Sequence, residues 1–215
     1  MMRALCLLII VLTLFSCSEN ESEKKETSFN KMEELVNELE APDEINNLGK
    51  ETEKIFTAYY DIFSATLKSK NYPVLNGFIH PEYGCYIIES GGALPSLIKV
   101  YDFSKYKNQH NKTTFFDRAF IKANQQLEYD SLPKVICDKE VYDRQGCFAQ
   151  EVNPLLESQI WNYVGFNQKE IHVIESTAKT VGMTVVNTSN YTYYFSKIEG
   201  KWHITFVDLR VPCSA

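Results

Sequence analysis

The C-terminal part of the chain constrains its fold most, because strand-forming runs alternate there with turn residues. β-Branched and aromatic residues dominate four runs, at residues 170–176, 181–186, 191–198 and 202–209. Turn-forming residues separate the last three runs, at 187–190 and 199–201. Strands joined by such short turns pair with their chain neighbours, so the runs predict an antiparallel meander. Alternation along the last strand places Trp202, Ile204 and Phe206 on one face.

Two segments in the N-terminal half carry apolar residues at helical spacing. Residues 29–40 place four on one face, and Pro42 follows as a helix breaker: Met32, Leu35, Val36 and Leu39. Residues 50–69 carry a longer apolar face, formed by Ile55, Phe56, Tyr59, Ile62, Phe63 and Leu67. Helices followed by a meander predict an α+β fold, with helices packed on an antiparallel sheet, rather than a parallel α/β fold.

The middle of the chain is less regular. Residues 85–88 predict a short strand, and a short helix is predicted at 94–101 after two turn glycines. Residues 132–153 predict strands or loop around two neighbouring cysteines. Residues 154–164 predict a helix, since Pro154 suits a first helical turn.

The N-terminus has the layout of a secretory signal peptide. One basic residue, Arg3, precedes an apolar run at 5–15. The run is shorter than the ~20 apolar residues that a membrane-spanning helix needs. Residues 1–16 are therefore predicted to be a signal peptide.

The end of this run, Leu14-Phe15-Ser16-Cys17, resembles the bacterial lipobox. The resemblance implies cleavage before Cys17, diacylglycerol on its thiol and an acyl chain such as palmitate on its new amine. More than one acyl chain is needed for stable anchoring, and this arrangement supplies enough. The alternative is an ordinary signal peptide that ends before an unmodified cysteine.

Residues 17–28 are predicted to be a lipidated flexible tether, because no apolar residue follows Cys17 until Phe29. Their acidic start resembles the export signal of surface lipoproteins of the Bacteroidota, and the chain as a whole is similar to lipoproteins of that group. This implies attachment to the outer membrane, facing the cell surface or, if the acidic run is only a tether, the periplasm. Residues 29–48 then form a short helix and connection, and residues 49–215 the folded domain.

The charge balance argues against nucleic acid as a partner. Residues 1–16 contain one charged side chain, so their removal leaves 21 basic and 28 acidic residues. No cluster of Lys and Arg is present, and proteins that bind nucleic acid carry one.

Four cysteines remain after the signal peptide and Cys17: Cys85, Cys137, Cys147 and Cys213. In an oxidising compartment they are expected to be structural, as disulfides or as buried thiols. Three pairings are open, of which the local one joins Cys137 to Cys147 and leaves Cys85 with Cys213. No Cys-x-x-Cys motif and no His beside a Cys pair is present, so neither a metal site nor a cofactor is expected.

The final hairpin, at residues 194–204, has an aromatic strand followed by Gly200-Lys201-Trp202 and a second strand. Together with the long aromatic helix at 50–69, it resembles the nuclear-transport-factor-like family over residues 50–213. The resemblance implies a cystatin-like cone, in which a curved sheet wraps against helices around a pocket. Because that family includes enzymes, ligand binders and interaction modules, the resemblance implies no catalytic residue.

Four polar residues are weak candidates for acid–base chemistry. His80 and Glu82 form a pair if both face a pocket, and the alternative is a rigid turn set by Pro81 and Gly84. Asp61 lies beside the apolar face of the long helix, and His203 alternates with the apolar residues of the last strand. Each is more commonly solvated or structural.

Other residues suggest binding or modification. Tyr191, Tyr193, Tyr194 and Phe195 either stack on a sugar or an aromatic ligand or fill the core. Asp130-Ser131-Leu132 matches the short O-glycosylation pattern of the Bacteroidota, with Ser131 as acceptor.

Three hypotheses follow. The first is a non-catalytic lipoprotein, attached to the membrane by its lipid, that binds a small ligand, a glycan or a neighbouring envelope protein. The second is an enzyme of the same fold with an acid–base pair in its pocket. The third is a structural or assembly subunit that docks through residues 29–40.

Overall fold

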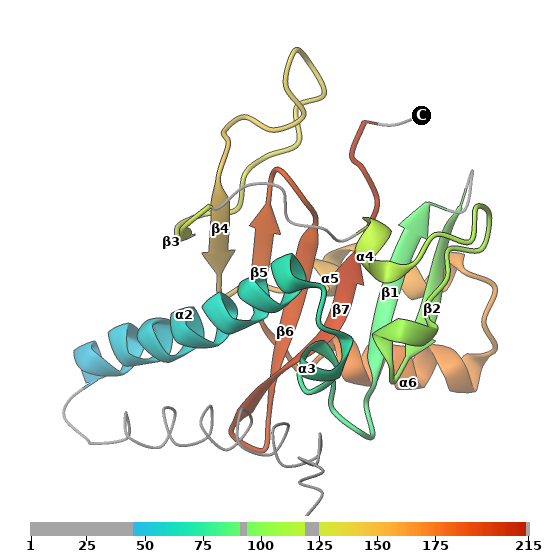
Figure 1. Cartoon of the computed structure of the whole chain (residues 1–215), viewed down its shortest axis with the longest axis horizontal. Coiled ribbons are helices and arrows are strands. Elements are labelled where there is room, and N and C mark those ends of the chain that lie inside the picture. The colour runs from blue at the N-terminus through green and yellow to red at the C-terminus, as the bar shows by residue number, and fades with distance from the viewer. Residues whose placement is uncertain (1–44, 91–93, 119–124, 214–215) are drawn as a thin grey trace, which may run out of the picture.

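The computed structural model describes residues 45–90, 94–118 and 125–213 (Figure 1). The predicted signal peptide, Cys17, the tether and the helix at 29–40 all lie outside the described residues. The long helix predicted at 50–69 is confirmed as α2, which spans Ile45–Ser69.

Within the described residues, seven strands form one sheet in the order β2-β1-β7-β6-β5-β4-β3. Their bounds are β1 Cys85–Ser90, β2 Pro95–Val100, β3 Leu127–Tyr129, β4 Cys147–Gln150, β5 Val181–Asn187, β6 Thr192–Ile198 and β7 Lys201–Asp208. The meander of β5, β6 and β7 is confirmed as antiparallel. The sheet as a whole is mixed, and not antiparallel as predicted, because β1 pairs parallel to β7 and β3 parallel to β4. These pairings join distant parts of the chain, so no local pattern shows them.

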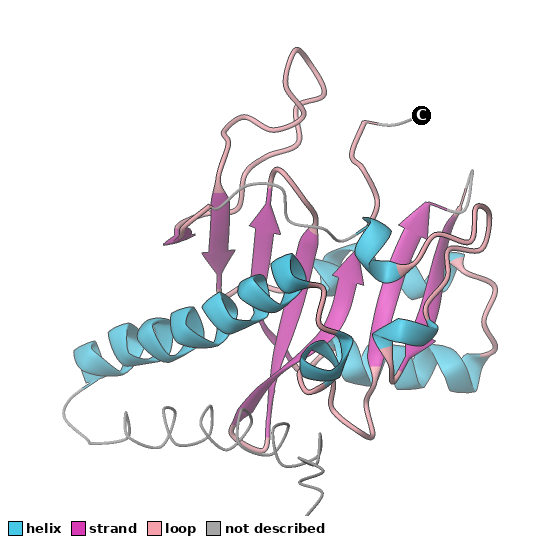
Figure 2. Cartoon of the chain, viewed as in Figure 1, coloured by secondary structure: helices cyan, strands magenta, loops and turns pink. Residues whose placement is uncertain are grey.

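Helices cover both faces of the sheet, in keeping with an α+β fold (Figure 2). On the face toward the viewer in Figure 1, called the near face, lie α2, α3 (Tyr72–Asn76) and α4 (Phe115–Arg118). On the opposite, far face lie α5 (Pro154–Ser158) and α6 (Gln168–Ala178). Two 3₁₀ turns complete the described elements, η1 at Phe103–Lys105 and η2 at Ile160–Tyr163.

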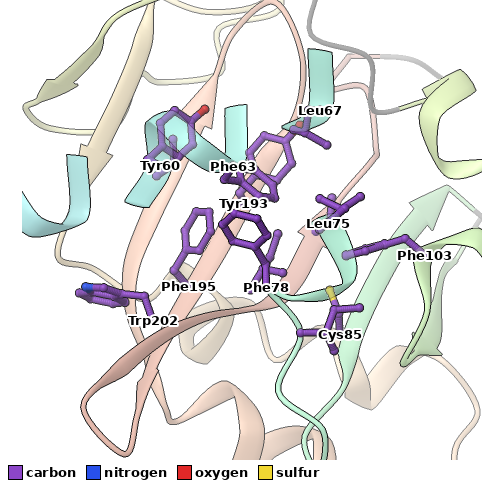
Figure 3. Close-up of a cluster of buried hydrophobic side chains, with 14 of the residues drawn as sticks. Tyr60, Phe63, Leu67, Leu75, Phe78, Cys85, Phe103, Tyr193, Phe195 and Trp202 are labelled. Atoms are coloured by element: carbon purple, nitrogen blue, oxygen red, sulfur yellow. The ribbon is translucent and has the colours of Figure 1, made fainter. Parts of the chain in front are cut away.

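The near face is filled with aromatic rings. The ring of Phe195 on β6 lies 5.2 Å from that of Phe56 and 5.4 Å from that of Phe63, both on α2 (Figure 3). Both contacts are edge-to-face, an arrangement that adds to the hydrophobic gain of burial. Tyr193 and Trp202 join the same cluster. The aromatic face of the helix and the aromatic strands therefore form one continuous core.

A second cluster covers part of the far face. Phe206 and Tyr86 stack there on the sheet, beneath Trp161 of η2 and Ile174 of α6. α6 begins with a capping box, in which Asn167 accepts from the backbone of Glu170 while Glu170 reaches back to Asn167. Residues 170–176 thus lie in a helix and not in the predicted strand, since this cap outweighs their β-branched content.

A β-bulge separates residues that strand alternation would place together. Phe195 pairs with Ile204, whereas its neighbour Tyr194 pairs with Phe206, so Thr205 is the extra residue. Trp202 and Ile204 face the near-side core as predicted, but Phe206 points to the far face. The prediction of one shared face was wrong for Phe206 because a bulge shifts the alternation by one residue.

Three other local predictions have mixed outcomes. The strand at 85–88 is confirmed within β1. The helix predicted at 94–101 is instead strand β2, which pairs antiparallel with β1 along its whole length. The helix predicted at 154–164 ends with α5, because Gln159 adopts a left-handed conformation (φ 43°), and the chain continues as η2.

One disulfide joins Cys137 to Cys213, with Cα atoms 5.4 Å apart. Cys85 and Cys147 are buried thiols. The predicted pairing of Cys137 with Cys147, and of Cys85 with Cys213, was therefore wrong. Cys85 and Cys147 each belong to a strand and face the near-side core. There each thiol packs among apolar side chains and forms no disulfide.

The described helices were also compared with the length and apolar character that crossing a bilayer requires. None of the helices within residues 45–213 meets both requirements.

Candidate ligand-binding site

A cavity of about 470 Å³ lies on the far face, beside the second cluster, which contains Trp161 of η2 and Ile174 of α6. Its floor comes from β5, β6 and β7, and its walls from two irregular segments, residues 132–142 and 210–212. The Cys137–Cys213 disulfide joins these two segments. We call this the stapled cavity. Its volume falls in the range of about 300–1,000 Å³ that is typical of small-molecule sites.

The strand register explains why polar groups line the floor. Thr184 pairs with Tyr194, Val186 with Thr192, and Thr192 with Asp208. Cross-strand partners share a face, so these side chains lie together on the side of the sheet that also carries Phe206. The floor is thus one row of hydroxyls and a carboxylate beside an aromatic ring.

An ion pair between a buried carboxylate and a partly exposed guanidinium lies at one end of the floor. Asp208 is 9% exposed, and its Oδ1 and Oδ2 accept from Arg210 Nε at 2.9 Å and Nη2 at 2.6 Å. Oδ1 also accepts from the Arg210 backbone N–H at 3.0 Å. The hydrogen bonds to Asp208 raise the pKa of the Arg210 guanidinium, against the opposing effect of burial. The positive charge of Arg210 and the negative charge of Asp208 cancel. Within the described residues Arg210 Nη1 makes no hydrogen bond, so its N–H groups are available to a ligand.

Two phenols flank this pair. Burial raises the pKa of Tyr194, and the neighbouring Asp208 carboxylate raises it further. The same two causes raise the pKa of Tyr142, which lies in the irregular segment above the floor. Both hydroxyls therefore keep their protons at neutral pH and remain hydrogen-bond donors.

The wall segments are held by polar contacts besides the disulfide. Lys134 N donates to Asp143 Oδ1 at 2.9 Å, which closes the loop that carries Cys137. Arg144 pairs with Asp130 at 2.5 Å, outside the cavity, and its guanidinium lies 4.1 Å from the centre of the Phe148 ring. These contacts tie a long irregular stretch of chain to its neighbours.

The chemistry of the lining favours a neutral ligand that carries hydroxyl groups. The Asp208–Arg210 pair is neutral as a whole, so it does not favour a charged ligand, but it presents N–H donors. Threonine and tyrosine hydroxyls offer further donors and acceptors. The apolar walls, with Leu132, Pro133 and Val211, suit the C–H faces of a sugar ring or a similar body.

The predicted acid–base candidates are only partly brought together. Asp61 on α2 and Glu82 after α3 are exposed. His80 is buried, and its ring lies 4.9 Å from that of His203. His80 Nδ1 accepts from the backbone N–H of Glu82 at 3.2 Å, as in the rigid turn that was the alternative to a catalytic pair.

Neither histidine lines the stapled cavity. Burial lowers the pKa of His203, and the neighbouring His80 and Lys201 add to this effect, so that the pKa is about 4. His203 is thus neutral at neutral pH, and its Nδ1 is buried without a hydrogen-bond partner among the described residues. His172, expected on a strand, lies exposed on α6.

The aromatic strand divides between core and cavity. Tyr193 and Phe195 belong to the near-side core, and Tyr191 packs against it. Tyr194 lines the stapled cavity. Ser131 is exposed and donates to Asp130 Oδ1 at 3.3 Å.

No sequence pattern pointed to Tyr142, Asp208 or Arg210. Asp208 is the last residue of β7 and Arg210 follows it by two residues, a spacing that matches no motif considered from the sequence. Tyr142 joins them only through the fold of the 132–142 segment. The one weak sequence signal for this site is the pair of opposite charges, Asp208 and Arg210, at the end of the last predicted strand.

A buried carboxylate on the near face was also missed. Glu89 is 1% exposed, and its Oε1 accepts from the Tyr106 hydroxyl and from Asn108 Nδ2. Its Oε2 makes no hydrogen bond with a described residue. Glu89 does not line the stapled cavity.

No group of three or more His, Cys, Asp or Glu side chains in the described part of the chain is arranged to hold a metal ion. Comparisons of the chain with protein-family models, curated proteins and solved structures found no match.

Proposed function

We propose that this protein is a lipid-anchored lipoprotein of a bacterial outer membrane and that its folded domain binds a small glycan in the stapled cavity. The observation that carries the proposal is a cavity lined by the neutral Asp208–Arg210 pair, by Tyr194 on its floor and by Tyr142 in a wall, with the walls joined by a disulfide. The domain acts by binding, without catalysis. Its long helix on a curved sheet supports a cone of the nuclear-transport-factor type, which we propose as the finer description of the fold.

A binding test uses a pair of matched double variants. Asp208→Asn/Arg210→Gln removes both charges of the cavity together, so that neither is left buried without its partner. Glu175→Gln/Lys179→Gln removes another ion pair, at the end of α6, that lies outside the lining and outside the wall segments. Maltose, cellobiose and N,N′-diacetylchitobiose serve as neutral probes in calorimetric or NMR titration.

We expect at least one probe to saturate the wild-type protein. The cavity variant should weaken this binding by about tenfold or more, because hydrogen bonds to charged groups contribute about 1.5–3 kcal/mol each. The control variant should bind as the wild type does. Failure of all three disaccharides, or equal weakening by both variants, would contradict the glycan proposal.

The anchor has its own test. Growth with an alkyne analogue of palmitate should label the wild-type protein, and Cys17→Ala should abolish both the label and the membrane attachment. Labelling that survives Cys17→Ala would refute lipidation at this residue.

A second candidate, an acid–base enzyme, has one supporting observation, the contact between His80 and His203. It predicts turnover of a hydrolase substrate that is lost in His80→Ala and in His203→Ala. A folded His80→Ala variant with unchanged activity, or a wild-type protein without activity, would dismiss this candidate.

A further inference from the structure

A second cavity, at the free edge of the sheet, has a different charge. Its volume is about 450 Å³, and it lies beside the C-terminal end of β2, the last strand on that side of the sheet order. Its lining carries Lys99, Lys105 and Lys107 and a single carboxylate, Asp102. We call it the lysine cavity. The whole chain has a formal net charge of −6, so this group of lysines runs against the overall charge.

Lys99 is held in place by two aromatic rings. Its Nζ lies 5.2 Å from the centre of the Tyr86 ring and 5.1 Å from that of Tyr101. Cation–π attraction favours this position. Burial lowers the pKa of Lys99, but hydrogen bonds and charge interactions with Tyr101 and Tyr86 outweigh burial and leave it raised. The ammonium group is therefore both fixed and charged at neutral pH.

The single carboxylate of the lining is already engaged by its own backbone turn. Asp102 Oδ1 accepts from Asn76 Nδ2 at 2.7 Å and from Ser104 N at 2.8 Å, which caps η1. The negative charge of Asp102 offsets one of the three ammonium charges. Its carboxylate cannot rotate toward a lysine side chain without losing the hydrogen bond that caps η1. Among the described residues, neither Lys99 nor Lys107 forms an ion pair with a carboxylate.

We propose that the lysine cavity binds the phosphate monoester group of a small organic phosphate, at a site separate from the proposed glycan site. About two positive charges remain uncompensated in the lining, which matches the charge of a phosphate monoester near pH 7. The lysine ammonium group binds phosphate as a compact point charge. The cavity is larger than a phosphate group, and the ring of Tyr101, 54% exposed, offers a face for the organic part. A free sugar phosphate and a lipid headgroup share this chemistry.

The test titrates the full-length chain with inorganic phosphate, glucose 6-phosphate, glucose and dihexanoyl phosphatidate, followed by NMR shifts of the backbone amides. The cavity variant is Lys105→Gln/Lys107→Gln, since both side chains are exposed and their loss should not disturb folding. The matched control is Lys169→Gln/Lys197→Gln, which removes the same charge from two exposed lysines outside the lining. Lys99→Met is a third variant, which keeps the apolar stem of the side chain.

We expect glucose 6-phosphate or dihexanoyl phosphatidate to saturate with a Kd of about 1 mM or tighter and to shift residues 98–107. Glucose should produce no shift there. The double cavity variant and Lys99→Met should each weaken binding by about tenfold, and added salt should weaken it in the wild type. Tighter binding of glucose 6-phosphate would indicate a soluble phosphate ester, and tighter binding of phosphatidate a lipid headgroup. Absence of saturation by every phosphate probe, or equal weakening by the control, would overturn the proposal.

Discussion

The two faces of the sheet share the same strands but differ in what covers them. On the near face, the aromatic side chains of α2 pack directly on β6 and β7, and the rings fill the space between helix and sheet (Figure 3). On the far face, helices cover only part of the strands, and irregular segments joined by a disulfide cover another part. The comparison shows how one sheet provides stability on one face and an open cavity on the other.

The largest expected effect tests this division within two adjacent residues of β6. Phe195→Ala should destabilise the protein by about 3–5 kcal/mol, because it removes a buried ring that contacts several others. Tyr194→Ala should cost at least about 1 kcal/mol less, because its ring borders the stapled cavity. Urea unfolding of both variants measures the difference. Equal losses would mean that the far face is packed as tightly as the near face.

The next effect concerns the disulfide. Cys137→Ser/Cys213→Ser should destabilise the protein by about 2–4 kcal/mol, since the bond closes a long loop between residues 76 positions apart. The same variant should bind disaccharides more weakly, because both walls of the stapled cavity lose their connection. Peptide mapping without reduction checks the pairing itself. A Cys85–Cys213 peptide, or unchanged stability and affinity, would contradict the assigned role.

The third effect is smaller and depends on pH. Strand alternation places His203 opposite Trp202 and Ile204, and its folded-state pKa of about 4 lies below the ordinary value of 6.5. Its contribution to stability is thus complete above pH 6.5 and is lost as pH falls toward 4, because only the unfolded chain takes up the proton there. The ring is partly exposed, so we expect about 1 kcal/mol rather than the full value for a buried group. His203→Gln should flatten the stability profile between pH 6.5 and 4, and an unchanged profile would contradict this origin.

The near face was largely predictable from sequence, and the far face was not. The apolar spacing of α2 and the runs of β5 to β7 are local patterns, and each gave the correct element. The far face depends on a bulge at Thr205, which turns Phe206 away from Ile204, and such a bulge leaves no trace in composition. The capping residues Asn167 and Glu170 were visible in the sequence, and weighing them would have predicted α6.

The candidate site escaped prediction for a similar reason. Four cysteines allow three pairings, and the observed one joins two irregular segments that no spacing rule relates. Without that connection, nothing in the sequence brings Tyr142 near Asp208. The histidine contact was predicted only as separate candidates, because His80 and His203 come from a turn and a strand far apart in the chain.

The central claim is that the far-face cavity holds a ligand, and native mass spectrometry of the protein purified gently from its own host tests it most directly. We predict a discrete additional mass that disappears on denaturation, persists in Glu175→Gln/Lys179→Gln and is missing from Asp208→Asn/Arg210→Gln. Absence of additional mass in the wild type, or its persistence in the cavity variant, would contradict the claim.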